Sequence, residues 1–173
     1  MTARRSAALL AASALAAALT ACAPASTPTP SPTPTGFASE EEAFAAAEAT
    51  YRAYVDALNQ VDLSDPATFE PVYALLDGEA LASEKKTLTK MHADGWSVSG
   101  ETEVPSIFKG NTAGEILVCQ DVSKVAVINA AGESQVSPDR PDVFALDVTV
   151  VHDTRSSTGA RVVASKAIED DRC

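Results

Sequence analysis

The chain has 173 residues, of which 46% are hydrophobic, and a net charge of −11. This acidic balance argues against a nucleic-acid partner, which attracts a basic face, and against a surface that lies flat on anionic lipid. It suits a surface that faces the aqueous medium.

Residues 1–21 are predicted to form a secretory signal peptide. Arg4 and Arg5 give it a basic start, and an apolar run over residues 7–19 follows, broken only by Ser13. The run is shorter than the ~20 apolar residues that cross a bilayer core, which favours a signal peptide over a spanning helix.

The apolar run closes with Leu19-Thr20-Ala21-Cys22. An aliphatic residue and two small residues before a cysteine resemble the lipobox of bacterial lipoproteins. The resemblance implies that the Cys22 thiol takes a diacylglycerol and that the mature chain begins at Cys22. It also implies attachment to the extracytoplasmic face of the cell membrane, since two acyl chains anchor a protein firmly. An ordinary signal peptide with a chance cysteine is the alternative.

Residues 22–36 combine the lipidated Cys22 with a Pro/Thr-rich linker, APASTPTPSPTPTG. The linker has no apolar side chain larger than Ala or Pro, so it is not expected to pack into a core. Alternating prolines favour an extended conformation that would hold the domain roughly 40 Å from the membrane. A plain spacer is favoured over an O-glycosylated one, which the Ser and Thr residues would permit.

Residues 37–173 have the size of one domain, and two predicted helices open it. Ser39-Glu40-Glu41-Glu42 is a capping box, and apolar residues at steps of three and four extend the first helix to about Asn59. Asp65-Pro66 predicts a short turn. A second helix is predicted from about Pro71 to Leu76, because proline is tolerated only at the start of a helix.

A third helix is predicted from Glu79 to Ala93. Its buried side is expected to carry Leu81, Leu88 and Met91, with Gly95 as the C-terminal cap. The side chains expected to face water are Glu84, Lys85, Lys86 and Lys90.

From Trp96 the hydrophobic period changes from 3.6 to 2, which predicts strands. They are expected at residues 96–104, 107–108, 115–122, 124–129, 143–151 and 161–168, with Pro105 at a bulge or edge. Helices followed by consecutive strands predict an α+β fold with a curved antiparallel sheet. The helices should cover one face of that sheet, forming a cone, because each has an apolar stripe to bury.

This order of elements resembles the cystatin-like cone of the nuclear transport factor 2 (NTF2) superfamily. In detail it is similar to uncharacterised actinobacterial lipoproteins of that type. The stretches that carry the resemblance are Asp94-Gly95-Trp96, Cys119-Gln120-Asp121-Val122-Ser123, Arg140-Pro141-Asp142 and the terminal Cys173. The fold hosts isomerases, dehydratases and non-catalytic binding modules, so it does not by itself imply a function.

Cys119 and Cys173 are the two cysteines that follow Cys22. An even pair in an exported protein suggests a disulfide, which would close a long loop and stabilise the domain by up to ~4 kcal/mol. Two free thiols are the alternative.

The sequence predicts no catalytic, metal or cofactor site. His92 and His152 fall on different elements, whereas zinc sites need clustered Cys and His. No Gly-x-Ser-x-Gly nucleophile motif occurs. An isomerase-like enzyme would need a carboxyl group and a tyrosine in the apolar cone. Asp121 is the candidate carboxylate, because the strand alternation places Asp147 on the solvent face. A strand-end carboxylate bonded to backbone or water is the favoured interpretation of Asp121.

The leading hypothesis is a membrane-anchored lipoprotein whose cone is a non-catalytic binding module for a small apolar molecule or an envelope protein. The aromatic residues Tyr51, Tyr54, Tyr73 and Trp96 have the spacing of core residues, so packing in the core is the favoured interpretation. Lining a ligand cavity is the alternative. One alternative is an isomerase- or dehydratase-like enzyme that uses Asp121. Another is a structural surface protein with no cavity.

Overall fold

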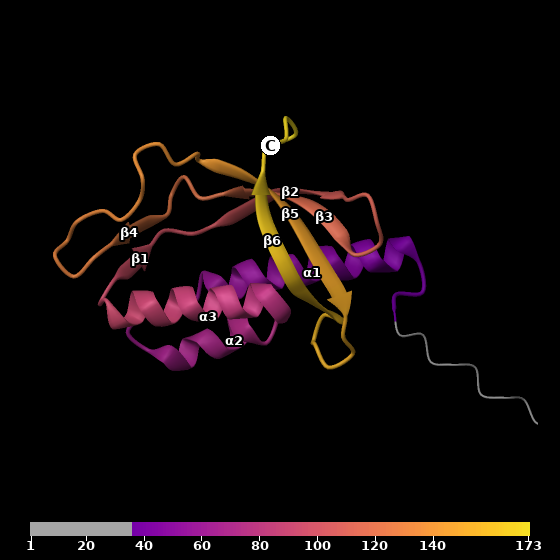
Figure 1. Cartoon of the computed structure of the whole chain (residues 1–173), viewed down its shortest axis with the longest axis horizontal. Coiled ribbons are helices and arrows are strands. Elements are labelled where there is room, and N and C mark those ends of the chain that lie inside the picture. The colour runs from indigo at the N-terminus through magenta and orange to yellow at the C-terminus, as the bar shows by residue number, and fades with distance from the viewer. Residues whose placement is uncertain (1–35) are drawn as a thin grey trace, which may run out of the picture. The chain divides into compact units, whose positions relative to one another are not determined.

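The computed structural model describes residues 36–173 (Figure 1). The predicted signal peptide, Cys22 and all of the linker except Gly36 lie outside the described residues. The helices are α1 (Glu40–Leu58), the 3-10 helix η1 (Pro66–Phe69), α2 (Glu70–Tyr73) and α3 (Gly78–Ala93). The strands are β1 (Ser97–Ser99), β2 (Glu103–Lys109), β3 (Glu115–Asp121), β4 (Ala126–Ile128), β5 (Val143–His152) and β6 (Ala160–Ile168).

The predicted capping box begins α1, but one of its two hydrogen bonds has a different partner. The Ser39 hydroxyl accepts a hydrogen bond from the Glu42 backbone N–H at 3.1 Å. The Glu42 carboxylate in turn accepts from the backbone N–H of Ala38, at 2.8 Å, rather than from that of the capping residue itself. These bonds satisfy donors that the first turn of a helix leaves free.

The second helix is shorter than predicted. It is a single turn, Glu70–Tyr73, instead of a helix from Pro71 to Leu76. The chain leaves it to pair with β6, since the Val162 backbone N–H donates to the Leu75 carbonyl at 3.0 Å and the Val162 carbonyl accepts from Asp77 at 2.8 Å. This pairing joins residues far apart in the sequence, which a local pattern does not reveal.

The strands form a four-stranded antiparallel sheet in the order β2-β3-β5-β6 and a separate two-stranded sheet of β1 and β4. The long strand predicted over residues 96–104 is therefore wrong. Gly100, with a φ of 82°, separates β1 from β2 at a point where the chain meets the backbone of Lys124. Pro105 lies in the edge strand β2, where the register shifts between Glu103 and Ser106, as predicted.

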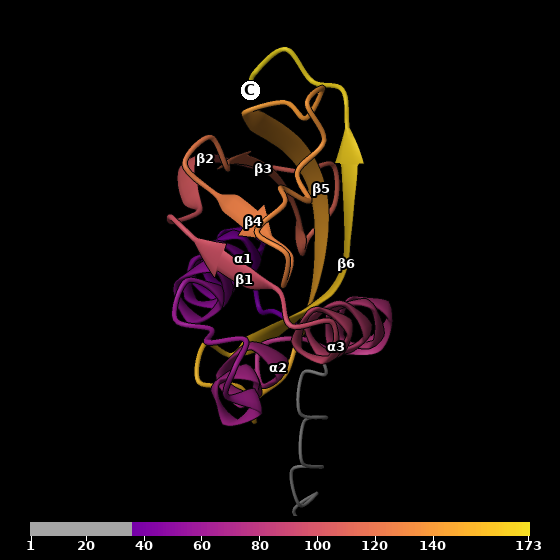
Figure 2. The ribbon, with the colours of Figure 1, turned by 90° about the vertical axis from the view of Figure 1, so that its left-hand side faces the viewer.

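The concave face of the four-stranded sheet packs on α1, and α3 lies beside β6 (Figure 2). The α+β class with helices on a curved antiparallel sheet is confirmed. The core draws its buried apolar side chains from all of these elements: Ala47, Tyr51 and Val55 from α1, Leu88 from α3, and Ile116, Val118, Val148, Val150 and Val162 from the sheet.

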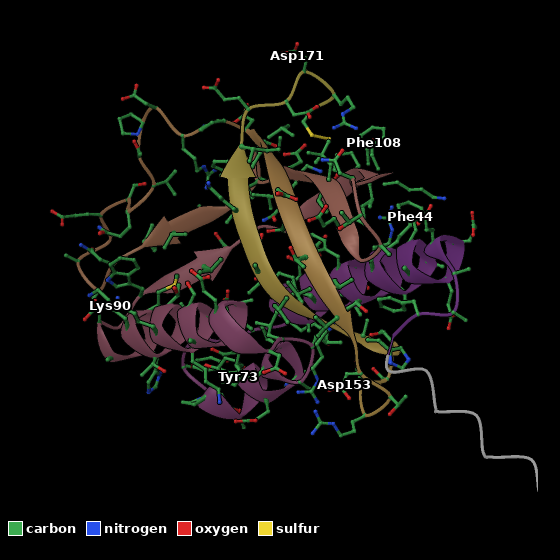
Figure 3. The ribbon with its side chains drawn as sticks, turned by 45° about the vertical axis from the view of Figure 1, so that its right-hand side comes forward. Phe44, Tyr73, Lys90, Phe108, Asp153 and Asp171 are labelled. Atoms are coloured by element: carbon green, nitrogen blue, oxygen red, sulfur yellow. A yellow bond between two sulfur atoms is a disulfide. The ribbon has the colours of Figure 1, made fainter. Side chains whose placement is uncertain are left out.

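The opposite face of the sheet carries Cys119, which comes to disulfide distance from Cys173 as predicted, with 5.3 Å between the two Cα atoms. The bond holds the C-terminal segment against the sheet (Figure 3). The Arg172 guanidinium lies over the Phe108 ring, 5.3 Å from its centre. The chain end is therefore fixed by a covalent bond and a cation–π contact.

Gly100 tests the turn between the two sheets, and Gly132 is its matched control. Their φ angles are 82° and 83°, but a Cβ at Gly100 would lie 1.9 Å from the Lys124 carbonyl oxygen, whereas a Cβ at Gly132 meets nothing within 4 Å. Gly132→Ala should lower the free energy of unfolding by about 1–2 kcal/mol through the left-handed backbone alone. Gly100→Ala should lower the free energy of unfolding by ~1–3 kcal/mol more than Gly132→Ala does, because its Cβ also clashes. Equal losses in urea denaturation would contradict this account.

Candidate functional site

Two cavities lie inside the cone, and Glu84 of α3 lines both of them. The first has a volume of about 450 Å³ and lies between α1, α3 and β6. The second has a volume of about 240 Å³ and lies between the end of α1, α3 and the strands β1 and β4. The presence of cavities contradicts the hypothesis of a purely structural protein, which predicted none.

Small side chains keep the first cavity open. Ala80 and Ser83 of α3 and Ala164 and Ser165 of β6 all line it, and all four side chains are short. One helical turn beyond Glu84, the larger Leu88 is 4% exposed and fills the core. The cavity therefore follows from the small residues that line it on α3 and β6.

Glu84 was expected to face water, and this expectation is wrong. Its side chain is mostly buried, and its carboxylate accepts a hydrogen bond from the Tyr54 hydroxyl at 3.1 Å. Burial raises the pKa of Glu84, and the bond from Tyr54 opposes that rise. Within residues 36–173, no Lys, Arg or His lies within the 4.0 Å of an ion pair with this carboxylate.

A signal for Glu84 was present in the sequence. Ala80, Glu84, Leu88 and Met91 are spaced by four, four and three residues, so they share one side of a helix. Glu84 was expected to face water because of its residue type, although its position lies on the apolar stripe. A charged residue on such a stripe is the feature that marks the site.

Tyr51 and Tyr54 form the α1 wall of the first cavity, with ring centres 5.6 Å apart. The Tyr51 hydroxyl donates to Gln120 Oε1 of β3 at 2.6 Å. The pKa of both tyrosines is raised, mainly by burial and secondly by the negative charge of Glu84. Both hydroxyls therefore keep their protons, and each donates that proton to a partner within the protein.

Asp121, the carboxylate named in the alternative enzyme hypothesis, lies outside the cavities. It accepts a hydrogen bond from the Ser123 backbone N–H at 2.8 Å. The Ser123 hydroxyl and this N–H lower the pKa of Asp121, which is the opposite of what a general acid in an apolar pocket needs. Asp147 is exposed, as predicted. The enzyme hypothesis loses its proposed carboxylate.

The remaining candidate residues have structural roles. His92 Nδ1 lies 2.6 Å from the Leu63 carbonyl oxygen, and His152 packs edge-on against Phe37. Tyr73 packs edge-on against Phe69, and Lys90 Nζ lies 5.7 Å from the Trp96 ring centre. Neither Tyr73 nor Trp96 lines the two cavities.

Two negative findings apply to the part of the chain that the structure describes. Among residues 36–173, no three His, Cys, Asp or Glu side chains gather to hold a metal ion. In the same range no helix has both the length and the apolar character needed to cross a membrane.

Comparison with known proteins gives distant structural matches. No family model and no curated protein matches the chain. The VirB8 protein of Agrobacterium tumefaciens is 12% identical, with a TM-score of 0.49 over 75% of this chain and 94% of that one. The intermembrane-space region of the chloroplast protein ARC6 is 13% identical, with a TM-score of 0.47 over 72% and 95%. An NTF2-like protein of unknown function from Exiguobacterium is 14% identical, with a TM-score of 0.41 over 70% and 98%.

An NTF2-like protein is thus among the structural neighbours of the chain. Identities this low and TM-scores below 0.5 carry no argument about ligand, partner or activity. The lipoprotein and actinobacterial parts of the sequence resemblance stay predictions.

Substitution of Glu84 by glutamine tests the cost of the buried carboxylate. A raised pKa means that the folded state binds this proton more tightly than the unfolded state, so wild-type stability falls as pH rises through that window. Glu84→Gln should therefore be more stable than the wild type at neutral pH. The difference should shrink as pH falls toward 4.5, the ordinary value for Glu. Asp56→Asn, at an exposed position of α1, controls for the loss of one charge. A difference between Glu84→Gln and wild type that is constant with pH would contradict the assignment.

Proposed function

We propose that the domain is a non-catalytic binding module for a small, mostly apolar molecule, held at the extracytoplasmic face of the membrane through lipid on Cys22. The cavity between α1, α3 and β6 is the observation that carries the binding part. The sequence at residues 1–22 carries the anchoring part.

The first cavity has the character of a ligand site. Its volume of about 450 Å³ lies within the 300–1,000 Å³ usual for small-molecule pockets. Leu76, Ala80 and Val162 supply apolar wall, while Tyr54 and Glu84 place polar groups at one point of it. An apolar wall with a few convergent polar groups is the usual composition of such sites.

An acid–base enzyme is the second candidate, because Glu84 is a mostly buried carboxylate whose pKa burial raises. Reactions of the isomerase kind also need a hydrogen-bond donor for the oxygen that becomes negative. The hydroxyls of Tyr51 and Tyr54 both donate to protein groups, at 2.6 Å and 3.1 Å. A substrate oxygen would find both protons engaged, so binding is favoured over catalysis.

A protein partner from the cell envelope has weaker support. Val98 of β1 and Ile128 of β4 are 44% and 41% exposed, and they lie on the small two-stranded sheet. Two exposed side chains are ordinary for a protein surface. The cavity is the more specific feature.

Blocking the first cavity should abolish binding of an apolar probe. The protein to use is the unlipidated chain, meaning the mature chain with Cys22→Ser, secreted behind an ordinary signal peptide. N-phenyl-1-naphthylamine should gain fluorescence with this chain. Ser83→Trp, which fills the cavity, should remove the gain, and Ala82→Trp, at an exposed position of the same helix, should keep it. Equal binding by both variants would overturn the assignment of the site.

Lipidation is tested separately by intact mass. Protein from the membrane fraction should have a mass that starts at Cys22 and includes a diacylglycerol. Cys22→Ser should carry no lipid, because only a thiol forms the thioether. An unmodified wild-type mass would reject the anchor and leave the cavity assignment untouched.

A further inference from the structure

The chemistry of the ligand can be read from the charge of Glu84. Among residues 36–173, Glu84 is the one residue that lines both cavities. Tyr54 supplies its carboxylate with a single hydrogen bond, at 3.1 Å. A carboxylate has about four lone-pair positions, so most of its capacity to accept hydrogen bonds remains for a ligand.

Two other charged residues line the first cavity, and their charges are opposite to one another. Glu79 lies in the first turn of α3 and Lys166 lies near the end of β6, and both are exposed. Lys166 also pairs in register with Asp147 of the neighbouring strand. The mostly buried Glu84 therefore leaves one uncompensated negative charge in the wall of the first cavity.

The first cavity has an apolar wall beside this carboxylate. Leu76, Ala80 and Val162 line it together with Glu84, and its volume is about 450 Å³. Such a wall favours a hydrocarbon group over a polar one.

We infer that the ligand is an amphiphile with one ammonium group, which binds Glu84 while its hydrocarbon chain lies against the apolar wall of the first cavity. This inference rests on the proposed binding function and adds the ligand class. An ammonium donates up to three hydrogen bonds and supplies the missing positive charge. The rings of Tyr51 and Tyr54 beside Glu84 offer it further stabilisation through cation–π contact. A carboxylate ligand would be repelled by Glu84. A neutral alcohol would leave the negative charge of Glu84 unbalanced.

Three molecules of equal chain length separate charge from apolar binding. Octylamine, 1-octanol and octanoate are titrated at neutral pH against N-phenyl-1-naphthylamine bound to the unlipidated chain. Octylamine should displace the probe at a concentration at least about tenfold lower than 1-octanol, since hydrogen bonds to charged groups are the strong ones. Octanoate should be the weakest. Hexylamine should bind more weakly than octylamine by about fourfold per methylene removed.

Variants assign the preference to one carboxylate. Glu84→Gln should bring octylamine and 1-octanol to within about twofold of one another while leaving 1-octanol unchanged. Asp56→Asn, at an exposed position of α1 that lines neither cavity, should keep the full preference for the amine. Far-ultraviolet circular dichroism establishes that each variant is folded.

The outcomes distinguish the inference from the function on which it rests. Equal displacement by octylamine and 1-octanol in the wild type would overturn the ammonium class and leave the binding function standing. A preference for the amine that survives Glu84→Gln would also overturn the inference, because the charge would then lie elsewhere. If the wild type binds neither the probe nor any of the three molecules, the proposed function fails together with the inference.

Discussion

The hydrogen bond from Tyr51 to Gln120 is the constraint on which the arrangement of the cone depends. Tyr51 is 1% exposed, and a hydroxyl at that depth must find a partner or cost free energy of about 1–3 kcal/mol. Gln120 of β3 supplies that partner at 2.6 Å. The bond fixes α1 in rotation and translation against the sheet. Tyr54, nearly one turn further along α1, then necessarily faces α3, where Glu84 meets it.

The elements that the sequence predicted well are those set by local chemistry. The capping box at Ser39, the proline in the first turn of α2 and the alternation over residues 143–151 depend on near neighbours only. Each agrees with the structure, apart from the partner of Glu42. The pairing of Cys119 with Cys173 was also accessible, because a chain predicted to be exported, with two cysteines after Cys22, offers one intramolecular disulfide.

The elements that the sequence predicted poorly depend on distant contacts. The second helix ends early because Leu75 and Asp77 pair with Val162. The break between β1 and β2 follows from the approach of Gly100 to Lys124. Glu84 was misplaced for a different reason, since residue type and helical position disagreed and the type was followed. Asp121 has the favoured structural role, because a local turn with Ser123 satisfies its carboxylate.

The position of Glu84 argues for selection on binding rather than on stability. An aliphatic side chain there would complete the stripe formed with Leu88 and Met91 and would fill space that the protein leaves empty. A natural sequence that breaks its own hydrophobic pattern does so mainly at functional sites, where the free energy lost in folding is recovered when a partner binds. The small residues Ala80 and Ser83 beside Glu84 extend the same argument, because they hold open the volume into which the carboxylate projects. A buried charge and an unfilled volume each lower stability, and their coincidence on one side of α3 is accounted for by a ligand that compensates both.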